Sequence, residues 1–428
     1  MPYLAIFSVL TTIFMLSHSS FAAERGIEFV PASTPEEIQL RQRLLPDDDI
    51  WWTVTGEQMA WMHKNVPQLF PTVNVYRTGA VSDLEVNQNP EITDFEISTP
   101  TGLMAFSDFL ESEHSTTMGM VILHQGKIVY EHYPRMQHYE KPIYWSVTKV
   151  MPATLIRIYE EQGQIDVDQA IKFYLPELTY SDIADISVRN ILDMATGLDC
   201  QDEYDDRQSC YYQYSMAIGD GYREDNAADN PYDFLKTLKV SRHAGPGEQF
   251  SYSGMNTFVL AWLVEKITGE PFQDAFTREI WQHIGAEADA SFLAYRYGIP
   301  LTHGGFLSNM RDLARFGLLF TPSESVVSSK KIISDNHINF LLNSANPNLI
   351  RDNGSHNIYQ WDYIDNEGFM FKGGWGGQGL IVNPKLDLVA VYTSYFKEDY
   401  SQKNLRPVVF DVLRGVYGGR ISGNETQR

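Results

Sequence analysis

Residues 143–149 read Ile-Tyr-Trp-Ser-Val-Thr-Lys, and they place a serine three positions before a lysine at the start of an apolar helical run. Residues three apart share one face of a helix, so the side chains of Ser146 and Lys149 are expected to lie next to each other. A serine at a helix N-terminus also lies near backbone N–H groups that have no partner within the helix. The pair therefore indicates either a serine nucleophile with a basic neighbour or a plain capping serine followed by a solvated lysine.

The same spacing occurs twice more, at Ser328–Lys331 and at Ser394–Lys397, so the spacing alone decides little. Ser328 lies in a polar, serine-rich stretch, and Ser394 ends an apolar strand pattern. Ser146 follows an aromatic segment and opens an apolar helix. This context favours Ser146 over the other two serines.

Two distant features accompany the Ser146 pair. Tyr252 directly precedes an apolar helical run that begins near Met255, and residues 375–378 (Trp-Gly-Gly-Gln) lead into an apolar strand. A tyrosine in this position is most often core packing, and glycines before a strand are most often a bulge or a turn. Small residues at a strand end also let a ligand or another backbone approach closely.

Apolar patterns predict strands near both ends of the region that follows residue 117. Hairpins are expected over residues 120–130 and 379–392. Helical periodicity covers residues 147–161, 187–194, 255–267, 309–319 and 405–416. The pattern predicts an α+β fold, in which an antiparallel sheet is built from both chain ends and a helical region is inserted between its halves.

Composition and charge indicate the general class of protein and the partners that it is not expected to bind. The chain has 428 residues, of which 43% are hydrophobic, and this is typical of a packed globular protein. It has 33 basic and 55 acidic residues and a net charge of −22, which repels phosphate backbones. A nucleic-acid partner is therefore not expected.

The N-terminal residues are apolar and end in a small-residue segment at 19–23. This pattern predicts a cleaved signal peptide over residues 1–22, with a mature chain that starts near Ala23 and has no integral membrane segment. Prolines are spread through residues 23–117, which we expect to wrap a main domain at residues 118–420. We expect the protein to be exported, to the periplasm or outside the cell.

The order of these motifs resembles the serine hydrolases of the β-lactamase fold. This group includes class C β-lactamases, DD-peptidases, 6-aminohexanoate-dimer hydrolases and certain carboxylesterases. The resemblance covers roughly residues 118–416 and includes three supporting stretches: residues 194–198 (Met-Ala-Thr-Gly-Leu), 246–248 (Pro-Gly-Glu), and 304–317 with Gly-Gly-Phe and Arg-Asp-Leu-Ala-Arg-Phe-Gly. The last stretch is similar to the 6-aminohexanoate-dimer hydrolase branch.

The resemblance implies a role for each site residue. Ser146 would be the nucleophile, Lys149 its base and Tyr252 the proton relay, and a base is needed because a serine hydroxyl is a weak nucleophile at neutral pH. The backbone N–H groups of Ser146 and Gln378 would form an oxyanion hole. Trp375, Gly376 and Gly377 would contact the substrate.

Two departures from the class C pattern suggest the substrate. Gly254 stands where Tyr-x-Asn would have its asparagine, and residues 375–377 (Trp-Gly-Gly) take the place of Lys-Thr-Gly. The Trp-Gly-Gly form resembles esterase members of the fold. We therefore expect hydrolysis of carboxylic esters or small linear amides; the alternatives are a peptidoglycan D-Ala peptidase and a catalytically silent binding protein on the same fold.

The remaining candidates concern local structure. Pro152 lies inside the helix that is expected to carry Lys149, where it removes a backbone donor and can kink the helix after its first turn. Cys200 and Cys210 are the only cysteines, and an exported chain would allow them to form a disulfide. His303, beside a double glycine, is interpreted as structural.

No metal or cofactor is expected, since no His-Glu-x-x-His or paired cysteine spacing occurs. Four acidic residues form a loop that is either solvated or, as the less favoured alternative, a calcium site: Asp202, Glu203, Asp205 and Asp206. There is also no Gly-x-Ser-x-Gly elbow, which excludes an α/β-hydrolase.

Overall fold

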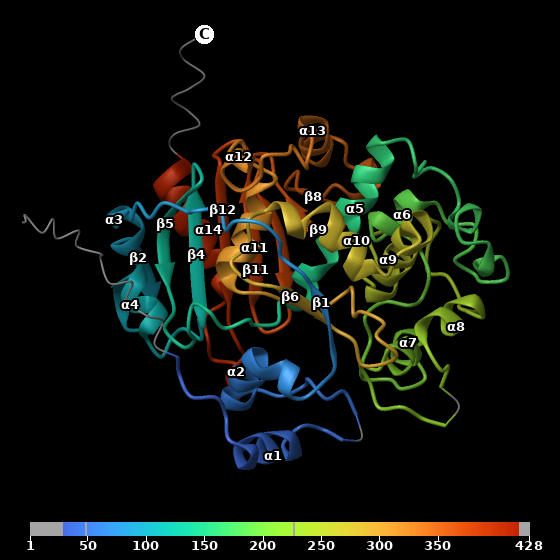
Figure 1. Ribbon diagram of the computed structural model, residues 1–428, viewed down its shortest axis with the longest axis horizontal. Coiled ribbons are helices and arrows are strands. Elements are labelled where there is room, and N and C mark those ends of the chain that lie inside the picture. The colour runs from blue at the N-terminus through green and yellow to red at the C-terminus, as the bar shows by residue number, and fades with distance from the viewer. Residues whose placement is uncertain (1–28, 48, 226, 419–428) are drawn as a thin grey trace, which may run out of the picture. The chain divides into compact units, whose positions relative to one another are not determined.

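A seven-stranded antiparallel sheet forms the centre of the computed structural model, which describes residues 29–47, 49–225 and 227–418 (Figure 1). The predicted signal peptide and its cleavage point lie outside these residues. In sheet order the strands are β5 (Lys127–His132), β4 (Gly119–His124), β12 (Leu388–Thr393), β11 (Gln378–Asn383), β10 (Met370–Gly374), β9 (Trp361–Ile364) and β8 (His356–Ile358). Because β4 pairs with β12 along its whole length, the sheet joins the two ends of the domain, as the sequence predicts.

Alternation along the central strands divides their side chains between two hydrophobic cores. In β4, Val121 and Leu123 belong to one core, and Met120 and Ile122 belong to the other. The second core is closed by α14 (Leu405–Tyr417), whose bounds agree with the predicted helix at 405–416. The first core is covered by the inserted helices.

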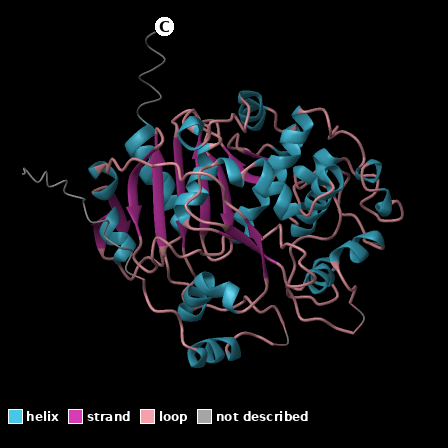
Figure 2. Cartoon of the chain, viewed as in Figure 1, coloured by secondary structure: helices cyan, strands magenta, loops and turns pink. Residues whose placement is uncertain are grey.

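The inserted region between β5 and β8 is mostly helical, and Figure 2 shows its helices gathered beside the block of strands. Its α-helices are α5 (Val150–Glu161), α6 (Val188–Leu192), α7 (Cys210–Ile218), α8 (Pro231–Lys236), α9 (Gly254–Thr268), α10 (Phe272–Glu279), α11 (Met310–Leu318), α12 (Glu324–Val327) and α13 (Asp335–Asn343). Side chains cap two of these helices: Ser187 Oγ accepts from Asn190 N at the start of α6, and Asn309 Oδ1 accepts from Asp312 N at 2.8 Å at the start of α11.

The helix that follows Ser146 differs from the prediction. Residues Trp145–Lys149 form a short 3₁₀ helix, η2, and the α-helix begins only at Val150. Pro152 therefore sits in the first turn of α5, and not after the first turn of a helix that begins near Ser146. A proline has no N–H to donate to the carbonyl four residues earlier, which is consistent with 3₁₀ geometry before it.

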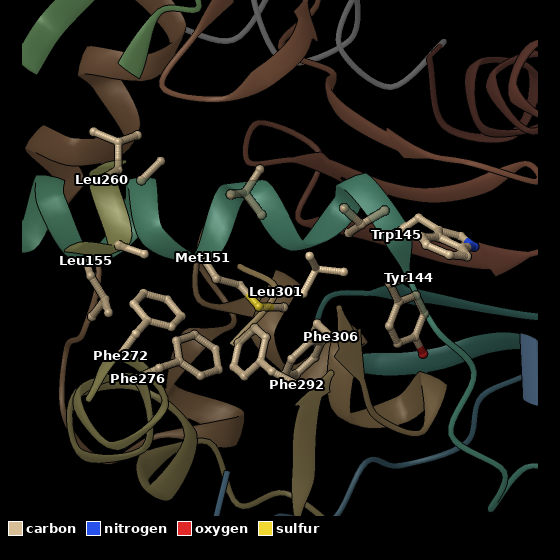
Figure 3. Close-up of a cluster of buried hydrophobic side chains, with 14 of the residues drawn as sticks. Tyr144, Trp145, Met151, Leu155, Leu260, Phe272, Phe276, Phe292, Leu301 and Phe306 are labelled. Atoms are coloured by element: carbon tan, nitrogen blue, oxygen red, sulfur yellow. The ribbon is translucent and has the colours of Figure 1, made fainter. Parts of the chain in front are cut away.

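Aromatic rings pack beneath α5 and hold η2 in place. Figure 3 shows Trp145 at one end of this row, with Tyr144, Phe306, Phe292 and Phe276 along the helix. Phe276, Phe292 and Phe306 contact one another with ring centroids 5.1–6.0 Å apart and are fully buried. Tightly packed rings with few accessible rotamers give the Ser146 turn a rigid support.

Residues 34–117 belong to the same compact unit as the main domain, among the described residues from Thr34 onward. This segment contains α1 (Pro35–Arg43), α2 (Gly56–Asn65), α3 (Pro90–Thr93), α4 (Phe106–Glu111) and a hairpin of β2 (Glu96–Thr99) and β3 (Gly102–Ala105). β1 (Thr72–Val75) joins β6 (Ala290–Leu293) and β7 (Phe306–Leu307) in a three-stranded sheet. Single 3₁₀ turns lie at Val66–Gln68, Ile171–Phe173, Pro176–Leu178, Trp281–His283 and Pro347–Leu349.

The two cysteines form the expected disulfide. The Cα atoms of Cys200 and Cys210 are 5.0 Å apart and their sulfurs are bonded. The bond closes the acidic loop between α6 and α7. No helix among the described residues has the length and apolar composition needed to cross a bilayer.

Candidate active site

Ser146 and Lys149 contact each other in η2. Lys149 Nζ donates to Ser146 Oγ at 2.9 Å and to the backbone oxygen of His303 at 2.8 Å. The Lys149 side chain is 1% exposed. The solvated-lysine alternative for this pair is therefore wrong.

Neither of the other serine–lysine pairs makes this contact. Ser328 Oγ donates to the backbone oxygen of Lys330, and Lys331 pairs with acidic side chains. Ser394 Oγ bonds to Thr116, and Lys397 Nζ donates to the Glu113 carbonyl. The structure thus distinguishes Ser146 from two serines that have the same spacing to a lysine.

Burial changes the acid–base chemistry of Lys149. Removal from water lowers the pKa of Lys149, the charge of Asp202 partly opposes this and the charge of Lys372 adds to it, so that the resulting pKa is about 8. About one lysine in ten is then neutral at pH 7, compared with a negligible fraction at an ordinary lysine pKa. Lys149 can therefore accept a proton from Ser146.

Tyr252 lies between two lysines, just before α9. Its ring centroid is 4.8 Å from Lys149 Nζ and 4.7 Å from Lys372 Nζ. Burial holds the pKa of its phenol well above the usual range, and a hydrogen bond with Ser146 only partly offsets this. The phenol therefore keeps its proton at neutral pH and lies within hydrogen-bond reach of Ser146.

Lys372 is the residue that the sequence analysis missed. It is fully buried on β10, donates to Tyr252 Oη at 3.3 Å and pairs with Asp362 Oδ1 at 2.6 Å. The expectation that residues 375–377 replace Lys-Thr-Gly is corrected: Lys372-Gly373-Gly374 lies three residues earlier, in the strand beside η2. Its Lys-x-Gly spacing was the available signal.

The β10–β11 hairpin separates the other predicted residues. Trp375 lines the cavity that contains Ser146, whereas Gly376, Gly377 and Gln378 line a second cavity of about 270 Å³. Gln378 pairs with Gly374 in the ladder between β10 and β11. Within the turn that joins these strands, Gly377 N donates to Gly374 O. Gln378 therefore lines the second cavity and not the one that contains Ser146, an arrangement that does not favour its expected place in the oxyanion hole.

The cavity beside Ser146 has a volume of about 500 Å³ and a wall that combines aromatic and acidic side chains. Trp52, from the segment before the main domain, packs against Trp145 at 5.5 Å and Trp375 at 5.2 Å between centroids. Its Nε1 donates to Asp220 Oδ1 at 2.8 Å. Sequence analysis did not single out Trp52, because nothing in its local pattern indicates contact with residues about a hundred or more positions away.

The acidic loop lies along the lining of this cavity and is largely solvated, as the favoured alternative predicts. Asp202, Glu203 and Asp205 line the cavity, and Glu203, Asp205 and Asp206 are exposed to solvent. Burial raises the pKa of the Asp202 carboxyl, although the Lys149 charge and the Gly254 N–H favour its ionised form. Among the described residues, no three or more His, Cys, Asp or Glu side chains are grouped so as to hold a metal ion.

Gly254 is required by close packing. A Cβ at this position would lie 2.3 Å from Tyr211 Oη and 2.7 Å from His303 Cδ2. Its N–H donates to Asp202 Oδ1 at 2.7 Å. An asparagine cannot occupy this place, so the amide group of Tyr-x-Asn is absent for a steric reason.

His303 contributes its backbone to the site. Its carbonyl accepts from Lys149, and its ring nitrogen Nδ1 lies 3.1 Å from Tyr214 Oη. Burial holds the pKa of the imidazole well below its usual value, and the neighbouring Lys149 charge adds to this. The ring is therefore neutral, and its role is to pack and to position.

Comparison with known proteins agrees with this geometry. The family model described as Beta-lactamase matches residues 104–408. The chain belongs to the β-lactamase family. Together with the Ser146–Lys149 contact, this makes it a serine hydrolase of the β-lactamase fold.

Its similarity extends to individual relatives. It is 29% identical over 295 residues to the 6-aminohexanoate-dimer hydrolase of Paenarthrobacter ureafaciens, covering 66% of this chain and 73% of that one. A Bacillus anthracis protein provisionally described as a 6-aminohexanoate-dimer hydrolase has a similar structure, with a TM-score of 0.72, 21% identity and coverage of 85% and 95%. EstCE1, a hydrolase with promiscuous acyltransferase activity, has a TM-score of 0.57 and 16% identity, with coverage of 73% and 96%. Both of these solved structures share the fold of this chain.

Proposed function

We propose that this enzyme hydrolyses carboxylic esters or small linear amides through an acyl-enzyme on Ser146. The observation that carries the proposal is the 2.9 Å contact between Ser146 Oγ and the buried amine of Lys149. A nucleophile, a base with a pKa near the working pH and a proton relay then meet at one end of a cavity of about 500 Å³.

The first half of the reaction forms the acyl-enzyme. Neutral Lys149 takes the Oγ proton while Oγ bonds to the substrate carbonyl carbon. The carbonyl electrons move to the oxygen, and then return as the C–O or C–N bond breaks. The leaving alcohol or amine takes a proton that Lys149 supplies through Tyr252.

The second half consumes one water molecule. Water attacks the Ser146 ester, gives a proton to Lys149, and releases the carboxylic acid as Ser146 regains its hydrogen. An ester and water thus give an acid and an alcohol.

The negative charge of the tetrahedral intermediate needs two N–H donors. We propose Ser146 N and Trp375 N, each worth roughly 3 kcal/mol to the transition state. Gly373 N donates to Asp362 Oδ2 at 3.0 Å on the side away from β11. Trp375 directly follows β10 and lines the cavity that contains Ser146, which supports its N–H as the second donor.

The cavity favours neutral or amine-bearing substrates over acids. Lys149 is the one lysine or arginine among its lining residues, and Lys372 is fully buried and paired with Asp362. Neither is free to hold a substrate carboxylate, which needs an accessible cation. Asp202, Asp205 and other acids on the wall would repel a carboxylate and attract an ammonium group, which is consistent with a linear amide that carries an amine.

A labelling and hydrolysis experiment tests the function. A fluorophosphonate probe should modify Ser146, as located by peptide mass spectrometry, and the enzyme should cleave p-nitrophenyl butyrate faster than a chromogenic cephalosporin. Absence of labelling would support the silent binding protein. Faster cleavage of a D-Ala-D-Ala peptide or cephalosporin than of esters and linear amides would support the peptidoglycan alternative.

We also propose that the protein is exported. The support is the Cys200–Cys210 bond together with the apolar N-terminal sequence, since disulfides persist in oxidising compartments. Fractionation of expressing cells and N-terminal sequencing should find a chain in the periplasm or medium that starts near Ala23. A cytoplasmic chain that keeps residues 1–22 would contradict export.

A further inference from the structure

His63 lies on α2, more than 80 residues before the nucleophile and outside residues 104–408 that match the family. Its side chain is fully buried. Trp145 Nε1 donates to His63 Nε2 at 3.0 Å, and Ile143 N donates to the His63 carbonyl at 2.9 Å. One histidine therefore holds the segment that leads into Ser146 by both its ring and its backbone.

The other ring nitrogen of His63 contacts the backbone at Ser394, next to the β10–β11 hairpin. His63 Nδ1 lies 3.0 Å from Ser394 O. Burial lowers the pKa of His63 to about 4, so the ring is neutral at neutral pH. Because Nε2 accepts from Trp145, Nδ1 carries the single proton and donates it to Ser394 O.

The Gln378 side chain continues this connection to Trp375. Gln378 Nε2 donates to Ser394 O at 2.9 Å and to Trp375 O at 3.2 Å. Gly376 packs directly on the imidazole, since a Cβ there would lie 2.5 Å from His63 Cε1. The hairpin end and the histidine are thus in close contact with no room between them.

The backbone of Trp145 shows why such a support is needed. Its φ is +46°, a left-handed conformation that a bulky residue adopts only when its surroundings hold it there. Trp145 directly precedes Ser146, so its conformation sets the direction of the Ser146 N–H. The hydrogen bond from its indole to His63 is one of the contacts that hold it.

We propose that His63 is a positioning residue that sets the spacing between the two N–H donors of the oxyanion hole, Ser146 N and Trp375 N. The imidazole is not among the residues that line the cavity, so it acts through Trp145 and the hairpin and does not touch the substrate. The inference rests on the proposed acyl-enzyme function.

The test compares three His63 substitutions with one control. His63→Leu removes both ring hydrogen bonds, while His63→Gln keeps an acceptor for Trp145 and His63→Asn keeps a donor for Ser394 O. His337→Leu is the matched control, since His337 is also buried on a helix, has a pKa lowered to about 3 by burial and lies on α13 away from the cavity. Kinetics are measured on p-nitrophenyl butyrate and normalised to active sites titrated by the p-nitrophenol burst.

We expect His63→Leu to lower kcat per active site by about tenfold or more and to change KM less than threefold, because misplaced donors affect the transition state and not the ground state. The affinity for an alkyl boronic acid, which forms a tetrahedral adduct with a catalytic serine, should fall by the same factor as kcat/KM. His63→Gln and His63→Asn should fall between Leu and the natural residue. His337→Leu should lower the melting temperature but leave kcat per active site unchanged.

Two results would overturn the proposal. In the first, His63→Leu melts at a lower temperature but keeps its kcat and boronic acid affinity per titrated site, which would mean a purely structural role. In the second, KM rises and kcat stays constant. If His63→Leu does not fold, Trp145→Phe, which removes the indole donor but keeps an aromatic ring, must lower kcat and boronic acid affinity together. Failure of the natural enzyme to react with the fluorophosphonate would instead refute the proposed function itself.

Discussion

The pairs Ser146–Lys149 and Ser328–Lys331 have the same sequence spacing and opposite chemistry. Lys149 is 1% exposed, and its burial lowers its pKa to about 8. The Lys331 side chain is 51% exposed; its modest burial acts in the same direction, but hydrogen bonds to Asp335 and Glu324 outweigh it and leave the pKa of Lys331 raised. The difference teaches that burial and charged neighbours make a lysine basic enough to use, and that the serine–lysine spacing alone does not.

Removal of the reacting groups should have the largest effect on kcat and should separate the two serine–lysine pairs most clearly. Ser146→Ala and Lys149→Ala should each lower kcat by about 10⁴-fold, because residues that act as one unit lose their function together, and the double variant should cost little more. Ser328→Ala and Lys331→Ala should keep full activity. Steady-state kinetics on p-nitrophenyl butyrate check all five variants, and losses that multiply in the double variant would contradict a single unit.

The pH dependence should reflect the lowered pKa of Lys149. A lysine base works only when unprotonated, so kcat/KM should fall tenfold per pH unit below about 8 and level off above it. A pH–rate profile between pH 6 and 9.5 measures this. A profile that is flat between pH 6 and 8 would show that another group takes the serine proton.

The charge of Asp202 should have a measurable effect on the pKa of Lys149. A carboxylate favours the protonated form of a nearby lysine, so Asp202→Asn should lower the pKa of Lys149 and move the acid limb of the profile to lower pH. The asparagine oxygen can still accept from Gly254 N. Asp335→Asn, beside Lys331, is the matched control and should leave the profile in place; an unchanged or upward-shifted limb in Asp202→Asn would contradict this account.

The disulfide should have the smallest effect on activity. Its loop of ten residues corresponds to about 2–3 kcal/mol of stability by loop closure. Asp202, inside that loop, is also held by Gly254 N, so Cys200→Ala combined with Cys210→Ala should change kcat less than threefold. Urea denaturation and kinetics measure the two effects, and a large loss of kcat with little loss of stability would mean that the bond itself places the acidic wall.

Local patterns predicted much of the fold. The apolar patterns in residues 120–123 and 388–392 predicted the central strands. Successive side chains of a strand point to opposite faces of the sheet, so the face of each residue follows from its own position in the chain. Capping residues such as Ser187 and Asn309 marked helix starts by short-range hydrogen bonds. The place of Pro152 within its helix was not predicted, since it depends on where the helix begins, and a 3₁₀ turn before Val150 moved that point.

By itself the sequence determined the sheet built from both chain ends, the family resemblance, and the residues Ser146, Lys149 and Tyr252. Only the tertiary structure decided that Lys372 contacts Tyr252, that Gln378 lines a second cavity, and that Trp52 and His63 reach the site from the first 65 residues. The reason is physical: the basicity of a lysine, the direction of a backbone N–H and the support of a strained turn depend on neighbours that are distant in the chain. Such neighbours leave no periodic signal in the sequence, because each contributes a single residue to the contact.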